Sequence, residues 1–284
     1  MNAAVVITGA SRGLGRALAD HLSRAGYDLV LCARNGALLR DVANTLKSRD
    51  GRNVVDVVAD ITDPNDVETL LRVTLERFGH IRGLVNNAAT LGPVGHLTLA
   101  QAGEWADTIS ANLTSVARVT AAVLPSMIAG GSGSIITLSG AGIGGPQLGT
   151  HMSAYVASKF GVVGFTEAMS RELSDTGVRI NAIAPGPVDT EFTARILQEG
   201  PSGAGDALYE ATVRNRAQPA TMAPYLDLAE YLLDDRSSWL SGSLLSARWD
   251  SIARLEAARD KIVTGSLLRL RRIDDDLFTQ IAST

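Results

Sequence analysis

Short runs of apolar residues, each about as long as one β-strand, recur along most of the chain. They are rich in Val, Ile and Leu and do not alternate with polar residues, which is typical of strands buried on both faces. Seven such runs are predicted as strands: Ala3–Thr8, Asp28–Ala33, Val54–Ala59, Gly83–Asn86, Ser134–Ser139, Arg179–Ala184 and Ser243–Ala247.

Between these runs, apolar residues recur with the spacing of helices. The segment 64–79 is the clearest case, because Asp63 can cap it, Pro64 stands at its first position and Gly79 ends it. Strands that alternate with helices predict an α/β fold with a doubly wound parallel sheet of about seven strands. The chain has no repeat, low-complexity tract or linker, so one domain is expected.

The first predicted strand leads into a glycine-rich turn, Thr8-Gly9-Ala10-Ser11-Arg12-Gly13-Leu14-Gly15, and a helical pattern follows it. Glycines at a strand-to-helix turn let the backbone approach a pyrophosphate, which then lies at the helix N-terminus. A purely structural turn is the alternative. The strand before and the helix after favour a dinucleotide-binding site.

The second predicted strand ends in Leu31-Cys32-Ala33-Arg34. Sites that prefer NAD usually carry an acidic residue here, which holds the ribose hydroxyls. This chain has Ala33 followed by Arg34, whose guanidinium can make a forked contact with a 2′-phosphate. Arg12 can join it. Both arginines can also be solvated surface residues, but we predict NADP(H) rather than NAD(H) as the cofactor.

The segment 153–159 places Tyr155 and Lys159 four residues apart. On a helix these two side chains share one face. A nearby ammonium favours the phenolate and so lowers the pKa of a tyrosine, which makes it a usable proton donor and acceptor. On its own, the pair can equally be an aromatic core residue beside a solvated lysine.

Composition narrows the class of protein. The chain has 284 residues, of which 45% are hydrophobic and 20% charged, and this composition is ordinary for a soluble domain. Its net charge of −4 argues against nucleic acid or an anionic membrane as partner. Cys32 is the only cysteine, so neither an internal disulfide nor a cysteine metal site is expected. No apolar run reaches membrane-spanning length and no signal peptide precedes the first strand, so we predict a cytoplasmic protein.

Taken together, the turn at 8–15, Asn86-Asn87-Ala88-Ala89, Asn112, Tyr155 with Lys159, and Pro185-Gly186 resemble the classical short-chain dehydrogenase/reductase family. The resemblance covers residues 1–250, which would form one Rossmann-fold domain. Residues 251–284 would be a C-terminal extension that packs on that domain or on a neighbouring subunit. The resemblance implies hydride transfer between a carbonyl and a secondary alcohol, in a homo-oligomer (a dimer or tetramer) built through the helix that carries Tyr155.

The resemblance also implies residue roles. Tyr155 would be the general acid/base, Lys159 would bind the nicotinamide ribose and lower the pKa of Tyr155, and Asn112 would hold a water in the proton relay. Asp60 would contact adenine, and Ala89 replaces a glycine of the family motif. The cofactor-binding residues would be Gly9, Ser11, Arg12, Gly13, Leu14, Gly15, Arg34, Asp60, Ile61, Asn87, Ala88, Tyr155, Lys159, Pro185, Gly186, Val188 and Thr190.

One position departs from the family pattern. The catalytic serine of the family is usually the second residue of a pair after the fifth strand, and that position is Gly140 in this chain. Ser139 can be displaced into the same place, Ser153 can substitute for it, or the serine function can be absent. We favour Ser139 as the fourth catalytic residue.

Two stretches beyond the motifs bear on the substrate. Residues 189–221 match the mobile substrate lid of the family and contain a glycine-rich break at 200–205, while His151, one turn before Tyr155, is interpreted as a loop residue. In the tail, Arg248, Arg271 or Arg272 is hypothesised to bind an anionic or polyhydroxylated substrate, although a surface helix with solvated charges fits equally well.

Two other functions share this fold. One is an epimerase or dehydratase that works through a transient oxidation, and its product would form without net change in NADPH. The other is a non-catalytic NADP(H)-binding regulator, which would retain Asn112, Tyr155 and Lys159 without using them. An NADP(H)-dependent oxidoreductase with a small-molecule carbonyl or alcohol substrate and no metal is the function that we predict.

Overall fold

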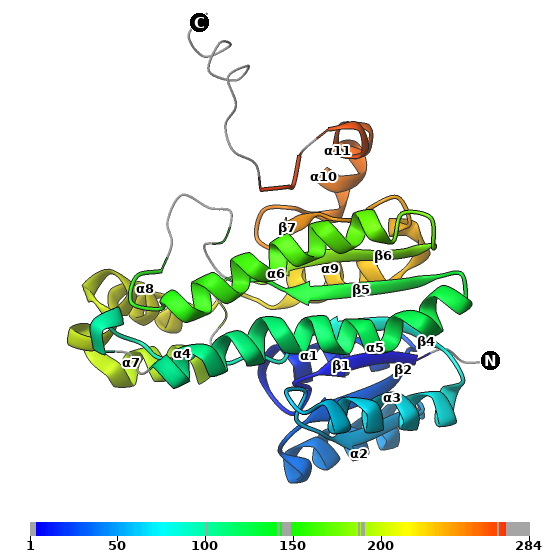
Figure 1. Ribbon diagram of the computed structural model, residues 1–284, viewed down its shortest axis with the longest axis horizontal. Coiled ribbons are helices and arrows are strands. Elements are labelled where there is room, and N and C mark those ends of the chain that lie inside the picture. Colours follow the sequence, from blue (N-terminus) through cyan, green and yellow to red (C-terminus); the bar gives the residue numbers. More distant parts are fainter. Residues whose placement is uncertain are drawn as a thin grey trace, which may run out of the picture.

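The computed structural model describes residues 4–99, 102–140, 143, 149–186, 188, 191–265 and 267–270. Its strands form one parallel sheet in the order β3-β2-β1-β4-β5-β6-β7 (Figure 1). The strands are β1 Ala4–Thr8, β2 Asp28–Ala33, β3 Val54–Val58, β4 Ile81–Asn86, β5 Gly133–Leu138, β6 Val178–Ala184 and β7 Leu244–Ser246. The predicted doubly wound sheet is confirmed, with strand ends that differ from the prediction by one or two residues.

Helices cover both faces of the sheet. One face carries α1 Gly13–Arg24, α2 Gly36–Asp50 and α9 Ala223–Leu233, and the other carries α3 Pro64–Phe78, α5 Ser115–Ala129 and α6 Ser153–Glu172. Neighbouring strand residues point to opposite faces, so Ile7 packs in the first layer and Val6 in the second. Both layers are apolar because each strand is buried between them. No helix within the described residues is long and apolar enough to cross a membrane.

The predicted start and end of α3 are confirmed by its capping contacts. The Asp63 side chain accepts a hydrogen bond of 2.8 Å from the backbone N–H of Asn65, and Pro64 occupies the first turn. Gly79 ends the helix with φ of 71°, a left-handed conformation that glycine adopts without strain. This helix therefore begins and ends on signals that are local in the sequence.

The strand order reverses between β1 and β4. Strands β2 and β3 follow β1 on one side of it, and β4 then pairs with the other side of β1. In a doubly wound sheet, the carboxyl ends of the two strands beside such a reversal leave a crevice in which ligands bind. Gly9 follows β1 and Asn87 follows β4, so both lie at this crevice.

The described part of the C-terminal extension packs on its own domain. It forms two short helices, α10 Ile252–Ala257 and α11 Arg259–Thr264. Leu255 and Ile262 are buried in the layer that contains α9. Farther on, the N–H of Leu244 donates to the carbonyl of Leu268 at 2.7 Å, so the extension pairs with the outer edge of β7.

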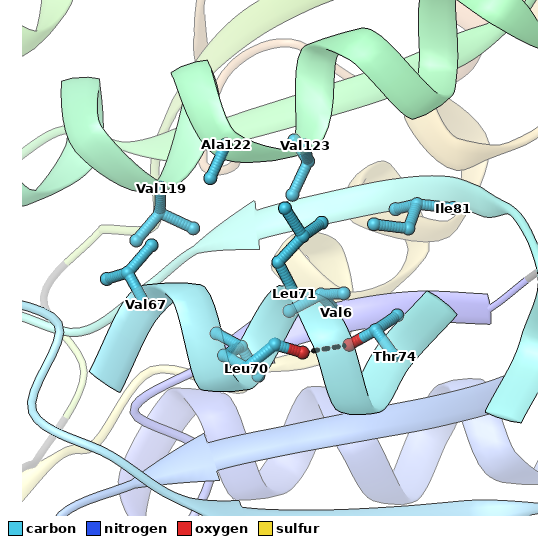
Figure 2. Close-up of a pocket in the computed structure, with 9 residues that line it drawn as sticks. All are labelled: Val6, Val67, Leu70, Leu71, Thr74, Ile81, Val119, Ala122 and Val123. Atoms are coloured by element: carbon cyan, nitrogen blue, oxygen red, sulfur yellow. Dashed lines mark hydrogen bonds between the residues drawn. The ribbon is translucent and has the colours of Figure 1, made fainter. Parts of the chain in front are cut away.

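A small apolar pocket lies between α3 and α5 above β1 and β4 (Figure 2). Its only polar side chain is Thr74, whose hydroxyl donates to the carbonyl of Leu70 at 2.6 Å. Because its lining offers no group for binding or catalysis, we interpret it as a packing gap between two helices.

The three remaining helices stand beside the carboxyl edge of the sheet. They are α4 Ala102–Ile109, α7 Glu191–Ala204 and α8 Asp206–Ala217, and a π-helical turn, Ser110–Thr114, joins α4 to α5. In Figure 1, α7 and α8 lie together beyond the N-terminal end of α6. The carboxyl edge of the sheet is therefore the part of the molecule in which a site can be enclosed.

Candidate active site

The glycine-rich turn packs closely against the segment that follows β4. A Cβ placed on Gly15 would lie 2.4 Å from the carbonyl oxygen of Gly9 and 2.5 Å from Nδ2 of Asn87. A Cβ on Gly9, where φ is +67°, would lie 2.8 Å from Cα of Ala88. Neither position has room for a side chain, so both glycines are required by the approach of backbone to backbone.

Thr8 and Asn87 connect the ends of β1 and β4. The hydroxyl of Thr8 accepts hydrogen bonds from the N–H groups of Asn87 at 3.0 Å and Ala88 at 3.1 Å. In return, Nδ2 of Asn87 donates to the carbonyls of Thr8 at 2.8 Å and Gly9 at 3.1 Å. The sequence analysis assigned no such role to Thr8, since its partner lies about eighty residues away along the chain.

This crevice fits a nicotinamide dinucleotide. Gly9, Ser11 and Gly13 lie in the turn at the N-terminus of α1, where unpaired backbone N–H groups favour a phosphate. At Gly13 a glycine is favoured by the positive φ of 55°, not by lack of room, because a Cβ there would meet nothing within 4 Å. Open space therefore lies beside the turn. Arg12, Leu14 and Gly15 complete the segment that would hold the pyrophosphate.

Arg34 and Asp60 meet at the ends of β2 and β3. Their side chains form an ion pair of 3.7 Å between Nη1 and Oδ2, and the Arg34 side chain is 76% exposed. Oδ1 of Asp60 accepts from the N–H and the hydroxyl of Thr62 at 2.9 and 2.8 Å. Although burial opposes it, these hydrogen bonds and the charge of Arg34 hold the pKa of Asp60 below its ordinary value. The next residue, Ile61, is buried, and its carbonyl accepts from Arg118 at 3.2 Å.

Tyr155 and Lys159 lie on one face of α6, as their spacing predicts. Nζ of Lys159 is 5.8 Å from the centre of the Tyr155 ring and donates to the carbonyl of Leu138 at 2.7 Å. Burial lowers the pKa of Lys159 to about 8 and raises the pKa of Tyr155 to about 12. The pKa of Tyr155 therefore shifts in the direction opposite to the lowering expected from the ammonium of Lys159, because burial disfavours the phenolate, and Tyr155 holds its proton at neutral pH.

Asn112 is buried in the π-helical turn between α4 and α5. Its Oδ1 accepts from the N–H of Thr90 at 2.8 Å, and its Nδ2 donates to the carbonyl of Thr90 at 2.8 Å and to Oγ of Ser158 at 3.0 Å. Ser158 in turn donates to the carbonyl of Tyr155 at 2.7 Å. Asn112 therefore ties the loop after β4 to the first turn of α6, and the π-turn marks a constrained place in the helix.

The chain leaves β5 through Ser139 and Gly140. A Cβ on Gly140 would lie 3.2 Å from the hydroxyl oxygen of Tyr155 and 3.0 Å from Cε1 of its ring. Gly140 is thus the position that faces Tyr155. Oγ of Ser139 is buried and has no hydrogen-bond partner among the described residues. Ser153 is engaged elsewhere, because its hydroxyl accepts from Nε1 of Trp105 at 3.2 Å.

The remaining predicted residues divide between described and undescribed parts of the chain. Pro185 and Gly186 follow β6, and the N–H of Val188 donates to the carbonyl of Gly186 at 3.0 Å. Thr190, Arg271 and Arg272 lie outside the described residues. Arg248 stacks on Trp249, with its guanidinium carbon 4.6 Å from the ring centre.

The stretch predicted as a lid lies against Tyr155. The Phe192 ring meets the Tyr155 ring edge to face, with centroids 5.8 Å apart and an angle of 86°. His151 is a loop residue, as interpreted from the sequence, and has a left-handed φ of 60°. Its Nδ1 lies 3.0 Å from the carbonyl oxygen of Gly203. Since a carbonyl only accepts, Nδ1 carries the proton, and His151 connects α7 to the loop that precedes α6.

Comparison with known proteins matches residues 3–200 to the family described as short chain dehydrogenase. A curated relative, sulfoacetaldehyde reductase 2 of Chromohalobacter salexigens, is 36% identical over 222 residues, which cover 77% of this chain and 85% of the relative. The family match includes both the glycine-rich turn and the Tyr155–Lys159 pair.

Solved structures share the whole fold. A variant of actinorhodin polyketide ketoreductase solved with NADPH has a TM-score of 0.77 at 29% identity and covers 86% of this chain and 95% of its own. A xylitol dehydrogenase bound to NAD+ has a TM-score of 0.78 at 23% identity, covering 86% of this chain and 97% of its own. Because both cofactors occur on this fold, the fold alone does not select between them.

Proposed function

Because the chain belongs to the short-chain dehydrogenase/reductase family, an oxidoreductase family acting on carbonyls and alcohols, we propose that it is NADP(H)-dependent and uses Tyr155 as general acid/base. The observation that supports this most is the placement of Tyr155 and Lys159. They share one face of α6, and Nζ of Lys159 is bound to the end of β5, at the sheet edge that also carries the glycine-rich turn.

The proposed chemistry divides between the cofactor and the protein. The nicotinamide, when bound, supplies or accepts a hydride. Tyr155 donates a proton to the substrate oxygen during reduction, and the charge of Lys159 stabilises the phenolate that remains. Asn112 fixes the position of α6 through Ser158, so the hydroxyl of Tyr155 is held in place before substrate arrives.

Arg34 supports the choice of NADP(H). It follows β2 directly, where an acidic residue would repel a 2′-phosphate, and its exposed guanidinium is reachable by a ligand. Its contact with Asp60 is long, at 3.7 Å, so a phosphate can compete for the same charge.

Arg34→Ala tests the cofactor proposal. We expect the Kd for NADPH to rise about 10-fold to 100-fold, because a charge-assisted contact to phosphate contributes about 1.5–3 kcal/mol. The Kd for NADH should stay within about twofold, since NADH has no 2′-phosphate. Fluorescence titration of both cofactors measures this. Arg24→Ala is the control, because Arg24 pairs with Asp20 on α1. Equal affinity of the wild type for the two cofactors would reject NADP(H) preference.

The pH profile tests the role of Lys159. Its pKa of about 8 means that the charged fraction falls as the pH rises through 8, whereas Tyr155, with a pKa of about 12, keeps its proton. We therefore expect kcat for carbonyl reduction to decline above about pH 8, measured between about pH 6 and 10. The residual activity of Lys159→Met should lack this decline. A wild-type profile without a decline, or the same decline in Lys159→Met, would contradict the assignment.

The predicted homo-oligomer, built through α6, stays a prediction, and so does the predicted cytoplasmic location. Gel filtration with light scattering would determine the oligomeric state. The tail hypothesis about Arg271 and Arg272 concerns residues outside the described chain.

A further inference from the structure

The tyrosine proposed to do the chemistry packs in a cluster of apolar side chains. Phe192, on α7, touches the Tyr155 ring, and Ile196, one turn later, is buried in the same cluster. Side chains from four separate segments make up this cluster, which we name the apolar cover. Besides Tyr155, its members include Leu91, Met152, Phe192, Ile196, Leu208 and Tyr209.

The α7 helix is amphipathic with respect to this cluster. Phe192 and Ile196 point inward, whereas Arg195 and Glu199 are exposed on the outer side. Lys159 lies beside the Tyr155 ring, and its Nζ already donates to the carbonyl of Leu138. On the neighbouring helix, the exposed Arg214 pairs with Glu210 at 3.5 Å. The described side chains that pack in one cluster with Tyr155 are therefore apolar, and the charged side chain beside its ring, that of Lys159, is already engaged.

Substrate must replace part of this cover. A carbonyl oxygen can accept a proton from Tyr155 only if its carbon occupies space beside the hydroxyl, and Phe192 packs against that ring. Two glycines with positive φ, Gly200 at 68° and Gly205 at 81°, are candidate hinge positions at the C-terminal end of α7. Displacement of Phe192 would leave room beside the aliphatic and aromatic side chains of the apolar cover, and His151 contacts the lid through the carbonyl of Gly203.

From this arrangement, and resting on the function proposed above, we infer that the substrate carries an uncharged apolar group, of ring or branched-chain size, next to its carbonyl, and that Phe192 selects for it. An apolar group regains the contact that Phe192 makes with Tyr155 and loses little on leaving water. A carboxylate or sulfonate in the same place would lose its hydration without gaining a partner. The relative named sulfoacetaldehyde reductase acts on a small anion, so the inferred substrate is of a different class.

A matched pair of ketones tests the inference. 4-Methylcyclohexanone and 4-oxocyclohexanecarboxylate have similar rings and differ in one charge. With NADPH and the wild-type enzyme, we expect kcat/KM to be at least about 10-fold higher for the methyl compound. The corresponding alcohols, 4-methylcyclohexanol and 4-hydroxycyclohexanecarboxylate, give a readout without turnover, and only the first should raise the thermal midpoint of the protein.

Variants on the two faces of α7 assign the effect to Phe192. Phe192→Ala should lower kcat/KM for 4-methylcyclohexanone about 10-fold and leave the Kd for NADPH unchanged. Phe192→Arg should reduce or reverse the preference between the two ketones, since it supplies the missing cation. Arg195→Ala, on the exposed face of the same helix, should leave the preference as in the wild type.

The outcomes separate the inference from the proposed function. If 4-oxocyclohexanecarboxylate were reduced as fast as 4-methylcyclohexanone, or faster, the inference would be overturned. The consumption of NADPH in that reaction would still support the proposed function. Turnover of sulfoacetaldehyde without turnover of either ring ketone would do the same. If none of these carbonyls led to consumption of NADPH, the inference and the function on which it rests would both be overturned. The same would follow if Tyr155→Phe consumed NADPH as fast as the wild type.

Discussion

Tyr155→Phe should lower kcat for carbonyl reduction by about 10²–10⁴-fold, because it removes the proposed proton donor and nothing else. The phenylalanine ring keeps the edge-to-face contact with Phe192, and the hydroxyl of Tyr155 forms no hydrogen bond to a protein group within the described chain that would be lost. With its pKa raised to about 12 by burial, Tyr155 holds a proton throughout the range in which the enzyme would be assayed.

The measurement is single-turnover oxidation of NADPH by wild type and variant with the same ketone. The Kd for NADPH and the thermal midpoint should both stay close to those of the wild type, which separates lost chemistry from lost binding or folding. A loss below about threefold would show that another group delivers the proton.

Ser139→Ala should lower kcat by about 10²–10³-fold, the usual effect of removing one donor to a developing oxyanion. Oγ of Ser139 is buried without a partner among the described residues, which is an unfavourable state for a hydroxyl. If the hydroxyl is retained for substrate, its removal should leave the free energy of unfolding unchanged or raise it by up to about 1 kcal/mol. Denaturant unfolding and steady-state kinetics on the same samples measure both effects.

Gly140 provides the matched variant for this prediction. A side chain at Gly140 faces Tyr155, with its Cβ 3.2 Å from the hydroxyl oxygen, so Tyr155 would have to shift by a few tenths of an ångström. In the double variant Ser139→Ala with Gly140→Ser, we expect part of the activity to return, because the new hydroxyl stands at the position that faces Tyr155. Full activity of Ser139→Ala alone would show that Ser139 is not a catalytic residue. Ser153, the other candidate, accepts a hydrogen bond from Trp105.

These two predictions differ in how far the sequence could support them. The Tyr155–Lys159 spacing places both side chains on one helical face wherever the helix lies, so that geometry followed from the sequence. The orientation of Ser139 against Gly140 depends on how the chain leaves β5 and turns toward α6. No local pattern encodes that turn, and the sequence left three alternatives for it.

Cofactor residues show the same division. The glycine-rich turn was recognisable because glycine alone suits positions such as Gly9 and Gly15, where a Cβ would meet backbone. Thr8 was not recognised as a connector, although its hydroxyl accepts from the backbone of Asn87 and Ala88. Threonine at a strand end is common, and only the pairing of β4 with β1 brings the backbone of Asn87 and Ala88 to its hydroxyl.

The sequence by itself determined the α/β class, the strand and helix succession, the glycine-rich turn and the Tyr155–Lys159 pair, because each depends on residue spacing within one element. Only the tertiary structure decided which helix covers which face, that Leu255 and Ile262 return to the core, and that Phe192 lies on Tyr155. These contacts join residues far apart along the chain. They arise from the packing of whole elements, whose geometry no short stretch of sequence contains.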